Sequence, residues 1–463
     1  MKALSRRFVN EQGIVLVIAL LILALLMVAG VGAIVSTQTD FKSSGNFKRG
    51  TQAFYFADAG INHARQELQN ADSIKDFGSV LNGSDFAIGT VIVSNSNFYG
   101  GTYTVTRQDS GTRTDQIRVL AKGTADNNAT AQIETWFKLD GGKPPKAVET
   151  NGDLKINGNP KISGTCGGAH SNDDMQISGN PDIEMAKGLT SSNNVPGGGT
   201  LPEGMDISGK PTIGGTKLDT NTERDAYQTA NNHDPVETTP KINPADYASL
   251  VAGMGSAGSH YILNNDGNVT TGGTCGTNGL CSGGTQLGQA PTGWEFDDGI
   301  WKVEGNSAAN GVFYSETQVR ISGSPGSSSS PWQATIIARD TIKVSGNPDI
   351  KPFPSSSTQL QNQLFVTGND LEISGNMKAN YAGGAILVHQ QVKISGNPKI
   401  NGWIIAGDGQ PTWTGDPFTS ASAGVDLNQI SGNPDITYSC DTSCFGPGCP
   451  PATVTTVSWA QKF

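Results

Sequence analysis

The sequence predicts a mainly β protein, in which a long N-terminal transmembrane α-helix and a small α/β unit precede a right-handed parallel β-helix. Three observations lead to this fold class. The 22 residues Ile14–Val35 carry no charge. All 23 prolines lie after residue 143, so only the first third of the chain can form long uninterrupted elements. The phrase Ser-Gly-Asn-Pro, or a near-copy of it, occurs eight times between residues 157 and 434.

Composition limits the size of the protein and the class of its partners. The 463 residues are enough for two or three domains. The chain contains 60 glycines and only 16% charged residues, which disfavours a mostly helical protein. Its net charge of −10 argues against a nucleic-acid partner, because nucleic acids favour a basic surface.

The N-terminus has the pattern of a membrane segment. As a helix, Ile14–Val35 would span about 33 Å, and the core of a bilayer is about 30 Å thick. Lys2, Arg6 and Arg7 precede this run, so the positive-inside rule places the leader in the cytoplasm and the rest of the chain outside it. The alternative is an ordinary secretory signal peptide or a plain membrane anchor, although an ordinary signal has a shorter apolar run.

The helix is expected to continue to residue 70. Apolar and small residues form one stripe at helical spacing, and no proline interrupts them: Phe47, Gly50, Phe54, Ala57, Ile61, Ala64 and Leu68. Residues 71–142 are expected to form a small β-sheet that packs on this stripe. Its strands are predicted at 100–108, 115–123 and 130–142, which are rich in β-branched and aromatic residues and bounded by turn residues.

These residues carry a family resemblance. The basic leader ending in Gly13, followed by an uncharged helix, resembles a type IV prepilin signal, and SSGNFKRGTQAFYFADAGINHARQEL resembles the N-terminal domain of PilX-type minor pilins. The resemblance implies that prepilin peptidase removes residues 1–13, that the mature chain begins at Ile14 and that the protein is methylated. It also implies an inner-membrane location before assembly, and then a place among other pilins and minor pilins in a pilus at the cell surface.

One position departs from the family pattern. Most pilins have Glu at the fifth mature position, where it is thought to meet the N-terminal amine of a neighbour, whereas this chain has Ile18. An unpaired charge in an apolar bundle would be costly, so a subunit without this Glu needs no partner on that side. In this respect the chain is similar to tip-located minor pilins and pseudopilins.

The repeats align into columns that predict a β-helix over residues 143–440. Four copies, aligned on their Ser-Gly pair, place apolar residues in three columns: Phe313, Ile336, Phe365 and Ile386; Val319, Ile342, Leu371 and Val392; Ile321, Val344, Ile373 and Ile394. Polar residues, such as Lys393, lie between the last two columns, which is the alternation of a strand with one buried face. Residues 214–261 break the rhythm and are expected to form an insertion with one helix at 243–253.

The repeated phrase itself is expected to form a corner of each coil. Glycine would supply unusual backbone angles there, and proline would exclude helix. Six asparagines recur at one position and are expected to stack as a hydrogen-bonded ladder: Asn159, Asn180, Asn347, Asn376, Asn397 and Asn433.

The six cysteines all follow the membrane segment, and exported chains meet an oxidising compartment, which favours disulfides. They are Cys166, Cys275, Cys281, Cys440, Cys444 and Cys449. Cys275–Cys281 is a plausible local bridge, whereas the pairing among the last three cannot be derived from spacing. Zinc is the alternative for that cluster, which contains no histidine. Residues 441–463 are expected to form a Cys-rich tail.

We find no catalytic, cofactor or metal motif, so the protein is not expected to be an enzyme. A carbohydrate-active β-helix would need grouped carboxylates, whereas Asp182, Asp349 and Asp435 share a corner column and suit turns. Four tryptophans could stack on sugars but are expected to pack instead: Trp301, Trp332, Trp403 and Trp413.

The sequence therefore predicts a minor pilin at the tip of a type IV pilus-like filament, acting in assembly and in adhesion to a surface or glycan ligand. The alternatives are a type II secretion pseudopilin and a membrane-anchored carbohydrate-active enzyme.

Overall fold

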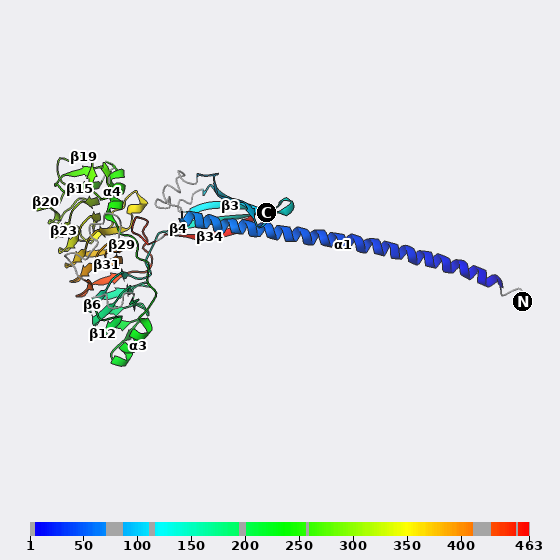
Figure 1. The fold of residues 1–463 in the computed structure, drawn as a ribbon, viewed down its shortest axis with the longest axis horizontal. Coiled ribbons are helices and arrows are strands. Elements are labelled where there is room, and N and C mark those ends of the chain that lie inside the picture. The colour runs from blue at the N-terminus through cyan, green and yellow to red at the C-terminus, as the bar shows by residue number, and fades with distance from the viewer. Residues whose placement is uncertain are drawn as a thin grey trace. The chain divides into compact units, whose positions relative to one another are not determined.

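The computed structural model describes residues 5–70, 87–110, 116–193, 201–255, 259–410, 427–450 and 452–462. A long N-terminal helix is followed by a mainly β region (Figure 1). The chain divides into two compact units. The first, here called the small unit, comprises residues 1–71, 83–138 and 455–463; the second, here called the head, comprises residues 72–82 and 139–454.

The small unit joins the long helix to a five-stranded sheet. Helix α1 spans Ser5–Asn70 without a break. The strand order is β1-β2-β3-β4-β34, and the bounds are Val91–Phe98, Gly101–Gln108, Gln116–Ala125, Ala129–Asp140 and Thr453–Lys462. The three strands predicted from the sequence correspond to β2, β3 and β4. The last part of the segment predicted as a tail, residues 441–463, contains β34, which pairs with β4 and completes the sheet.

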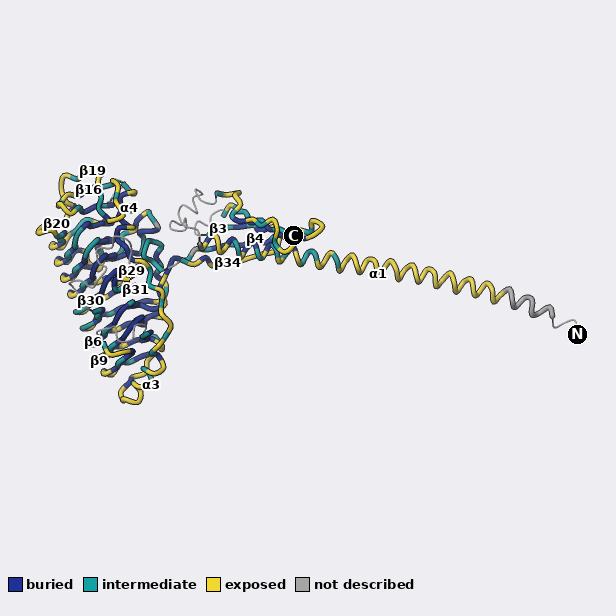
Figure 2. The backbone as a smooth tube through the Cα atoms, viewed as in Figure 1, coloured by how far each residue is buried: buried dark blue, intermediate teal, exposed yellow. Residues whose placement is uncertain are grey.

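Small residues allow α1 to lie close to the sheet. Ala53, Ala57 and Ala64 are fully buried on one face of the helix. On β3, a Cβ at Gly123 would lie 2.1 Å from the carbonyl oxygen of Ala53, so only glycine fits there. Figure 2 shows that most of α1 is exposed. The buried stripe starts at Ala53, whereas Phe47, which the sequence placed in it, is 78% exposed.

The head contains one ten-stranded sheet built from the repeats. Its strand order is β12-β9-β6-β32-β30-β28-β25-β23-β21-β20, and all neighbours are parallel except β20 and β21. In that order the strands span Met205–Ile207, Met175–Gly179, Leu154–Gly158, Asn428–Ile430, Val392–Ile394, Leu371–Ile373, Ile342–Val344, Val319–Ile321, Ile300–Val303 and Trp294–Asp297.

A seventeen-stranded sheet carries the other sides of the repeats. Its longer strands are β22 (Gly311–Ser315), β24 (Trp332–Ala338), β27 (Gln363–Thr367), β29 (Lys378–Val388) and β31 (Lys399–Ala406). Its shorter strands are β5 (Val148–Thr150), β7 (Lys161–Ser163), β8 (Ala169–Ser171), β10 (Asp182–Ile183), β11 (Leu189–Ser191), β13 (Thr212–Ile213), β14 (Thr216–Lys217), β15 (His260–Leu263), β16 (Val269–Thr271), β19 (Thr285–Gln286), β26 (Ile350–Lys351) and β33 (Asp435–Thr437). The hairpin of β17 (Thr274–Cys275) and β18 (Cys281–Ser282) forms a separate two-stranded sheet.

The predicted apolar columns are confirmed in register. Val392 pairs with Leu371, and Ile394 pairs with Ile373. Leu371, Val392 and Ile394 are fully buried and Ile373 is 1% exposed, whereas Lys393 between them is exposed. On the facing side, Phe313, Ile336, Phe365 and Ile386 pair in succession and are fully buried. Each repeat therefore contributes aliphatic and aromatic side chains to one continuous core.

Five of the six predicted asparagines form a ladder of side-chain hydrogen bonds along one corner. At the sixth, Asn347, Oδ1 accepts from the backbone amide of Asn376 at 3.1 Å. Nδ2 of Asn397 donates to Oδ1 of Asn376 at 3.1 Å, and Nδ2 of Asn433 donates to Oδ1 of Asn397 at 3.1 Å. The ladder continues from Asn433 to Asn159 and on to Asn180. Each asparagine can both donate and accept, so one residue type satisfies every position of the ladder.

Crowding explains the glycine of the repeated phrase better than backbone angles do. Gly375 has no positive φ, yet a Cβ there would lie 1.9 Å from the carbonyl oxygen of Gly346 in the adjacent repeat. At Gly396 and Gly432 φ is also positive, at 80° and 79°. Glycine is therefore needed mainly because successive corners are in direct backbone contact.

The order of the repeats in space differs from their order in the sequence. Strand β6, the first of its sheet in the sequence, pairs in parallel with β32, the last. In space the repeats run from β21 to β32 and then from β6 to β12, so the two ends of the head's chain meet inside the stack. This order follows from the insertion of the head between β4 and β34, which are neighbours in the small sheet. A stack in sequence order would leave its ends roughly eight strand spacings, or about 40 Å, apart.

Residues 214–261 connect one end of the stack to the other. The predicted helix is α4, Pro244–Gly253, and the side chain of Asn243 caps it by accepting from the amide of Ala245. A second helix, α3, spans Asn221–Asn231 and was missed from the sequence. Its signal was a capping box, in which Thr220 and Glu223 exchange hydrogen bonds.

Candidate functional site

The exposed apolar half of α1 is the first candidate functional surface. Helix α1 is long and apolar enough to cross a membrane, as judged by length and composition. Large apolar residues from Ile14 to Val35 are exposed by 51–72%. An apolar surface of this size needs a cover, either lipid or the apolar helices of other subunits. Gly13 and Ile14, the predicted processing residues, lie within the continuous helix.

All six cysteines form disulfides, so none is available to hold zinc. Cys275 and Cys281 form the local bridge considered from the sequence, on the β17–β18 hairpin. The pairing that spacing left open is Cys166–Cys440 and Cys444–Cys449.

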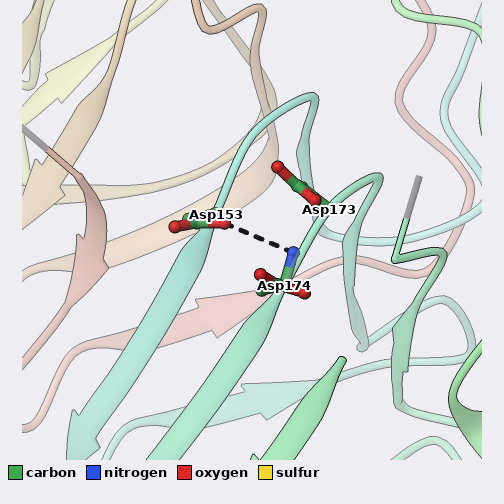
Figure 3. A group of neighbouring side chains, drawn as sticks. All are labelled: Asp153, Asp173 and Asp174. Atoms are coloured by element: carbon green, nitrogen blue, oxygen red, sulfur yellow. Dashed lines mark hydrogen bonds between the residues drawn. The ribbon is translucent and has the colours of Figure 1, made fainter. Parts of the chain in front are cut away.

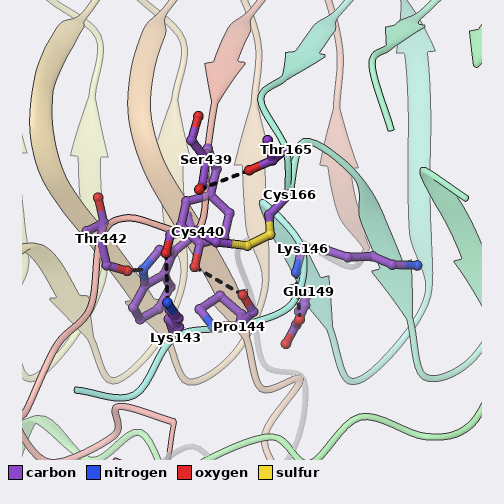
Figure 4. Close-up of a disulfide and its surroundings, with 11 residues drawn as sticks. Lys143, Pro144, Lys146, Glu149, Thr165, Cys166, Ser439, Cys440 and Thr442 are labelled. Atoms are coloured by element: carbon purple, nitrogen blue, oxygen red, sulfur yellow. Dashed lines mark hydrogen bonds between the residues drawn. A yellow bond between two sulfur atoms is a disulfide. The ribbon is translucent and has the colours of Figure 1, made fainter. Parts of the chain in front are cut away.

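The Cys166–Cys440 disulfide links the two ends of the head's chain, which are 274 residues apart (Figure 4). Hydrogen bonds surround it: Lys143 Nζ donates to the carbonyl oxygen of Cys440 at 2.9 Å, and Thr165 Oγ1 donates to that of Ser439 at 3.0 Å. The structure therefore closes the head covalently at the point where the chain enters and leaves it.

A buried polar column lies on the outer side of β5, β8 and β11. Glu149, His170 and Thr190 are neighbours in register, and Lys146 Nζ donates to the hydroxyl of Thr190. Burial raises the pKa of Glu149 to about 8 and lowers that of His170 to about 4. Burial also lowers the pKa of Lys146 to about 8, against the opposing charges of Asp234, Glu149 and Glu237. The 214–261 connection supplies the two acids at positions 234 and 237.

An open pocket of about 780 Å³ lies beside α4. The Cys275–Cys281 hairpin and the Gly446–Cys449 segment form parts of its wall, with Lys241 and Asp246 as charged residues. Two disulfides thus border this pocket, and it is a candidate place for a ligand of the head.

The residues considered for carbohydrate chemistry are not brought together as a site. Asp435 pairs with Lys161 and Lys399, and Asp182 pairs with Lys161, so lysines separate the acids of that column. Asp349 is buried and accepts from Tyr381 at 2.8 Å. Trp301 and Trp403 are fully buried and Trp332 is 2% exposed, so these rings pack in the core; Trp413 lies outside the described residues.

Sequence reasoning missed one group of acids. Asp153, Asp173 and Asp174 are all buried, and one carboxylate oxygen of each lies within 4.8 Å of the others (Figure 3). The only signal was that Asp153 and Asp174 each precede the first apolar residue of a repeat strand. Their proximity depends on the register of β6 and β9.

Comparisons with known proteins point to the N-terminal helix. Residues 12–62 match the family model of the PilX N-terminal region. No curated protein matches the chain. Among solved structures the chain is similar to the crystal structure of the competence-associated pilin ComZ from Thermus thermophilus, with 14% identity over 89% of this chain and 97% of that chain, at a TM-score of 0.25. By the match over residues 12–62, the protein is type IV pilin-like at its N-terminus.

Proposed function

We propose that the protein is a minor pilin located at the tip of a type IV pilus-like filament. The observation that carries the proposal is the uncovered apolar face of α1 within the segment that matches the PilX N-terminal model. That face suits a membrane before assembly and a bundle of pilin helices afterwards, because both surround it with apolar groups.

Two features support a terminal position in the filament. Ile18 is apolar and 52% exposed, so the fifth mature position offers no carboxylate to the N-terminal amine of a preceding subunit. The head is also far larger than the small unit. A head of this size at every subunit of a filament would collide with its copies. A tip subunit engages neighbours on one side only and avoids both problems.

We also propose that the head is a right-handed parallel β-helix with a non-enzymatic, adhesive role. The parallel, in-register repeats support this architecture, and parallel connections are right-handed in nearly all proteins. Disulfides and the asparagine ladder suit a domain that stays folded outside the cell. The pocket beside α4 is the proposed place for a surface or glycan ligand.

Processing at Gly13 tests the pilin assignment. The exported protein is expected to begin at Ile14, as measured by mass spectrometry of its N-terminal peptide. Gly13→Leu should leave an uncleaved precursor in the inner membrane, whereas Ser5→Leu in the same leader should be processed normally. Cleavage near residue 35 would instead indicate a secretory signal peptide and overturn the proposal.

A further inference from the structure

We propose that Asp153, Asp173 and Asp174 form a calcium site that joins two repeats of the head to the segment at Leu201–Gly204. The three aspartates come from two adjacent repeats. Leu154 of β6 pairs with Met175 of β9, so the residues just before them, Asp153 and Asp174, lie next to each other in the stack. Asp173 approaches from the preceding turn (Figure 3).

Backbone amides hold Asp153 and Asp174, and one oxygen of Asp174 is left without a partner. Asp153 Oδ2 accepts from the amide of Leu201 at 3.1 Å, and Asp174 Oδ1 accepts from the amide of Gly204 at 2.5 Å. Asp174 is 1% exposed, and its Oδ2 is buried with no hydrogen-bond partner. One carboxylate oxygen of Asp174 lies within 4.8 Å of an oxygen of Asp153 and an oxygen of Asp173. A buried carboxylate that has an unpartnered oxygen and lies against two other carboxylates needs a positive charge.

The charges around Asp174 make this need greater. Burial raises the pKa of Asp174, and the nearby charges that raise it further are those of Asp153 and Glu203. Burial and the charge of Asp153 also raise the pKa of Asp408. The charged groups that act on Asp174 and Asp408 in this way are all acidic. A cation bound among them would therefore offset the burial and repulsion of these acids in the folded state.

Asp153 and Asp174 each stand just before a repeat strand, and the other repeats do not stack acids at this position. There the corresponding residues are Gln318, Thr341, Asp370 and Gln391. Asp370 is the only acid of the four, its neighbours are uncharged, and its Oδ1 accepts from the amide of Gln391 at 3.2 Å. Two acids are adjacent at this position only in the β6 and β9 repeats, among the described residues.

The ligand chemistry favours calcium over other divalent cations. The three side chains offer only carboxylate oxygens, which are ligands for hard cations. Zinc favours nitrogen and sulfur ligands, and magnesium usually keeps several waters, which a site with residues 1–8% exposed accommodates poorly. Calcium takes six to eight oxygens in flexible geometry, and extracellular calcium sites work at about 0.1–1 mM.

The test uses the full-length mature protein, purified in detergent and stripped with a chelator. Isothermal titration with CaCl2 should show one ion per chain. At about 100 times Kd, CaCl2 should raise the melting temperature of the head by roughly 5 °C, with MgCl2 at the same concentration less effective. Absence of both binding heat and a thermal shift at 10 mM CaCl2 would overturn the proposal. An equal response to MgCl2 would overturn the assignment to calcium.

The variants Asp174→Asn and Asp182→Asn form a matched pair. Both remove one negative charge from the same region, but Asp182 is exposed and outside the cluster. Asp174→Asn should weaken calcium binding at least 10-fold, and Asp182→Asn should leave it unchanged. In chelator, Asp174→Asn should be at least as stable as the native protein, because it relieves repulsion. Native affinity in Asp174→Asn would contradict the site. If the carboxyl of Asp174 instead carries a proton, lowering the pH to 5 will stabilise the stripped native protein while CaCl2 has no effect, and that result would contradict the site.

Discussion

Asn159 donates from Nδ2 to Oδ1 of Asn433 at 3.3 Å, although 274 residues separate them in the sequence. This bond lies where the first repeat of the head meets the last, and it continues the ladder on both sides. The same junction contains the Cys166–Cys440 disulfide and the β6–β32 pairing. The repeats thus form one stack whose order in space is permuted relative to the sequence, and the predictions below test the contacts that hold it.

The register of the repeat strands predicts opposite outcomes for two adjacent positions. Val392 is fully buried and Lys393 is exposed. Val392→Asn removes an aliphatic side chain worth about 1.5–3 kcal/mol and buries an amide, so it should strongly destabilise the head. Lys393→Asn should change the free energy of unfolding by less than about 0.5 kcal/mol. Denaturant unfolding measures both, and equal effects would show that the register is wrong.

The corner glycines predict a steric effect that does not depend on positive φ. Gly375→Ala would place Cβ 1.9 Å from a backbone oxygen of the adjacent repeat, which cannot move without disturbing the stack. We expect a marked fall in melting temperature. Gly253→Ala, at the end of α4, has no atom within 4 Å of the new methyl group and should be neutral or slightly stabilising. A tolerated Gly375→Ala would refute the crowding explanation.

Only part of this fold could be predicted from the sequence. Repeated residues such as Leu371 and Val392 align by themselves, so the strands, their buried faces and the asparagine ladder could be predicted. Spatial order could not, because each repeat is equally compatible with any other as a neighbour. The pairing of β4 with β34 constrains the order of the repeats in space. The alternating residues of β34 can be seen in the sequence, but its partner β4 lies more than 300 residues earlier. The grouping of Asp153 with Asp174 was missed because it depends on the register of β6 and β9.

The disulfide at the junction should contribute more stability than the local one. Cys166–Cys440 closes a loop of 274 residues, and Cys275–Cys281 closes one of 6. On the chain-entropy estimate, loss of the first should cost about 3 kcal/mol more than loss of the second. Replacing both cysteines of each pair by serine and measuring thermal unfolding tests this difference. The account of the junction fails if the hairpin pair proves the more costly to remove.

The buried column beneath the 214–261 connection predicts a pH effect on stability. Burial raises the pKa of Glu149 from 4.5 to about 8. Between these values the folded state keeps a proton that the unfolded state releases, so this group's contribution to stability falls as pH rises from about 4.5 to 8. Glu149→Gln should match the native protein near pH 5 and become progressively more stable than it towards pH 8.

His170 contributes to the pH dependence of stability with the opposite sign, because burial lowers its pKa. Glu149→Gln and the native protein both retain His170, so comparing them at each pH cancels this contribution. Glu295→Gln, at an exposed position, is the control and should parallel the native protein at every pH. A constant difference between Glu149→Gln and the native protein from pH 5 to pH 8 would show that Glu149 is ionised in the folded head.

The location of the protein on purified filaments tests the central claim most directly. Antibodies against the head, applied to filaments whose shafts are marked with antibodies against the major pilin, should label one end of each filament and nothing else. Deletion of the gene should lower the number of filaments, and the labelled ends should return on complementation. Head label spaced along the shaft, or confined to the cell envelope with no label on filaments, would contradict a tip-located minor pilin.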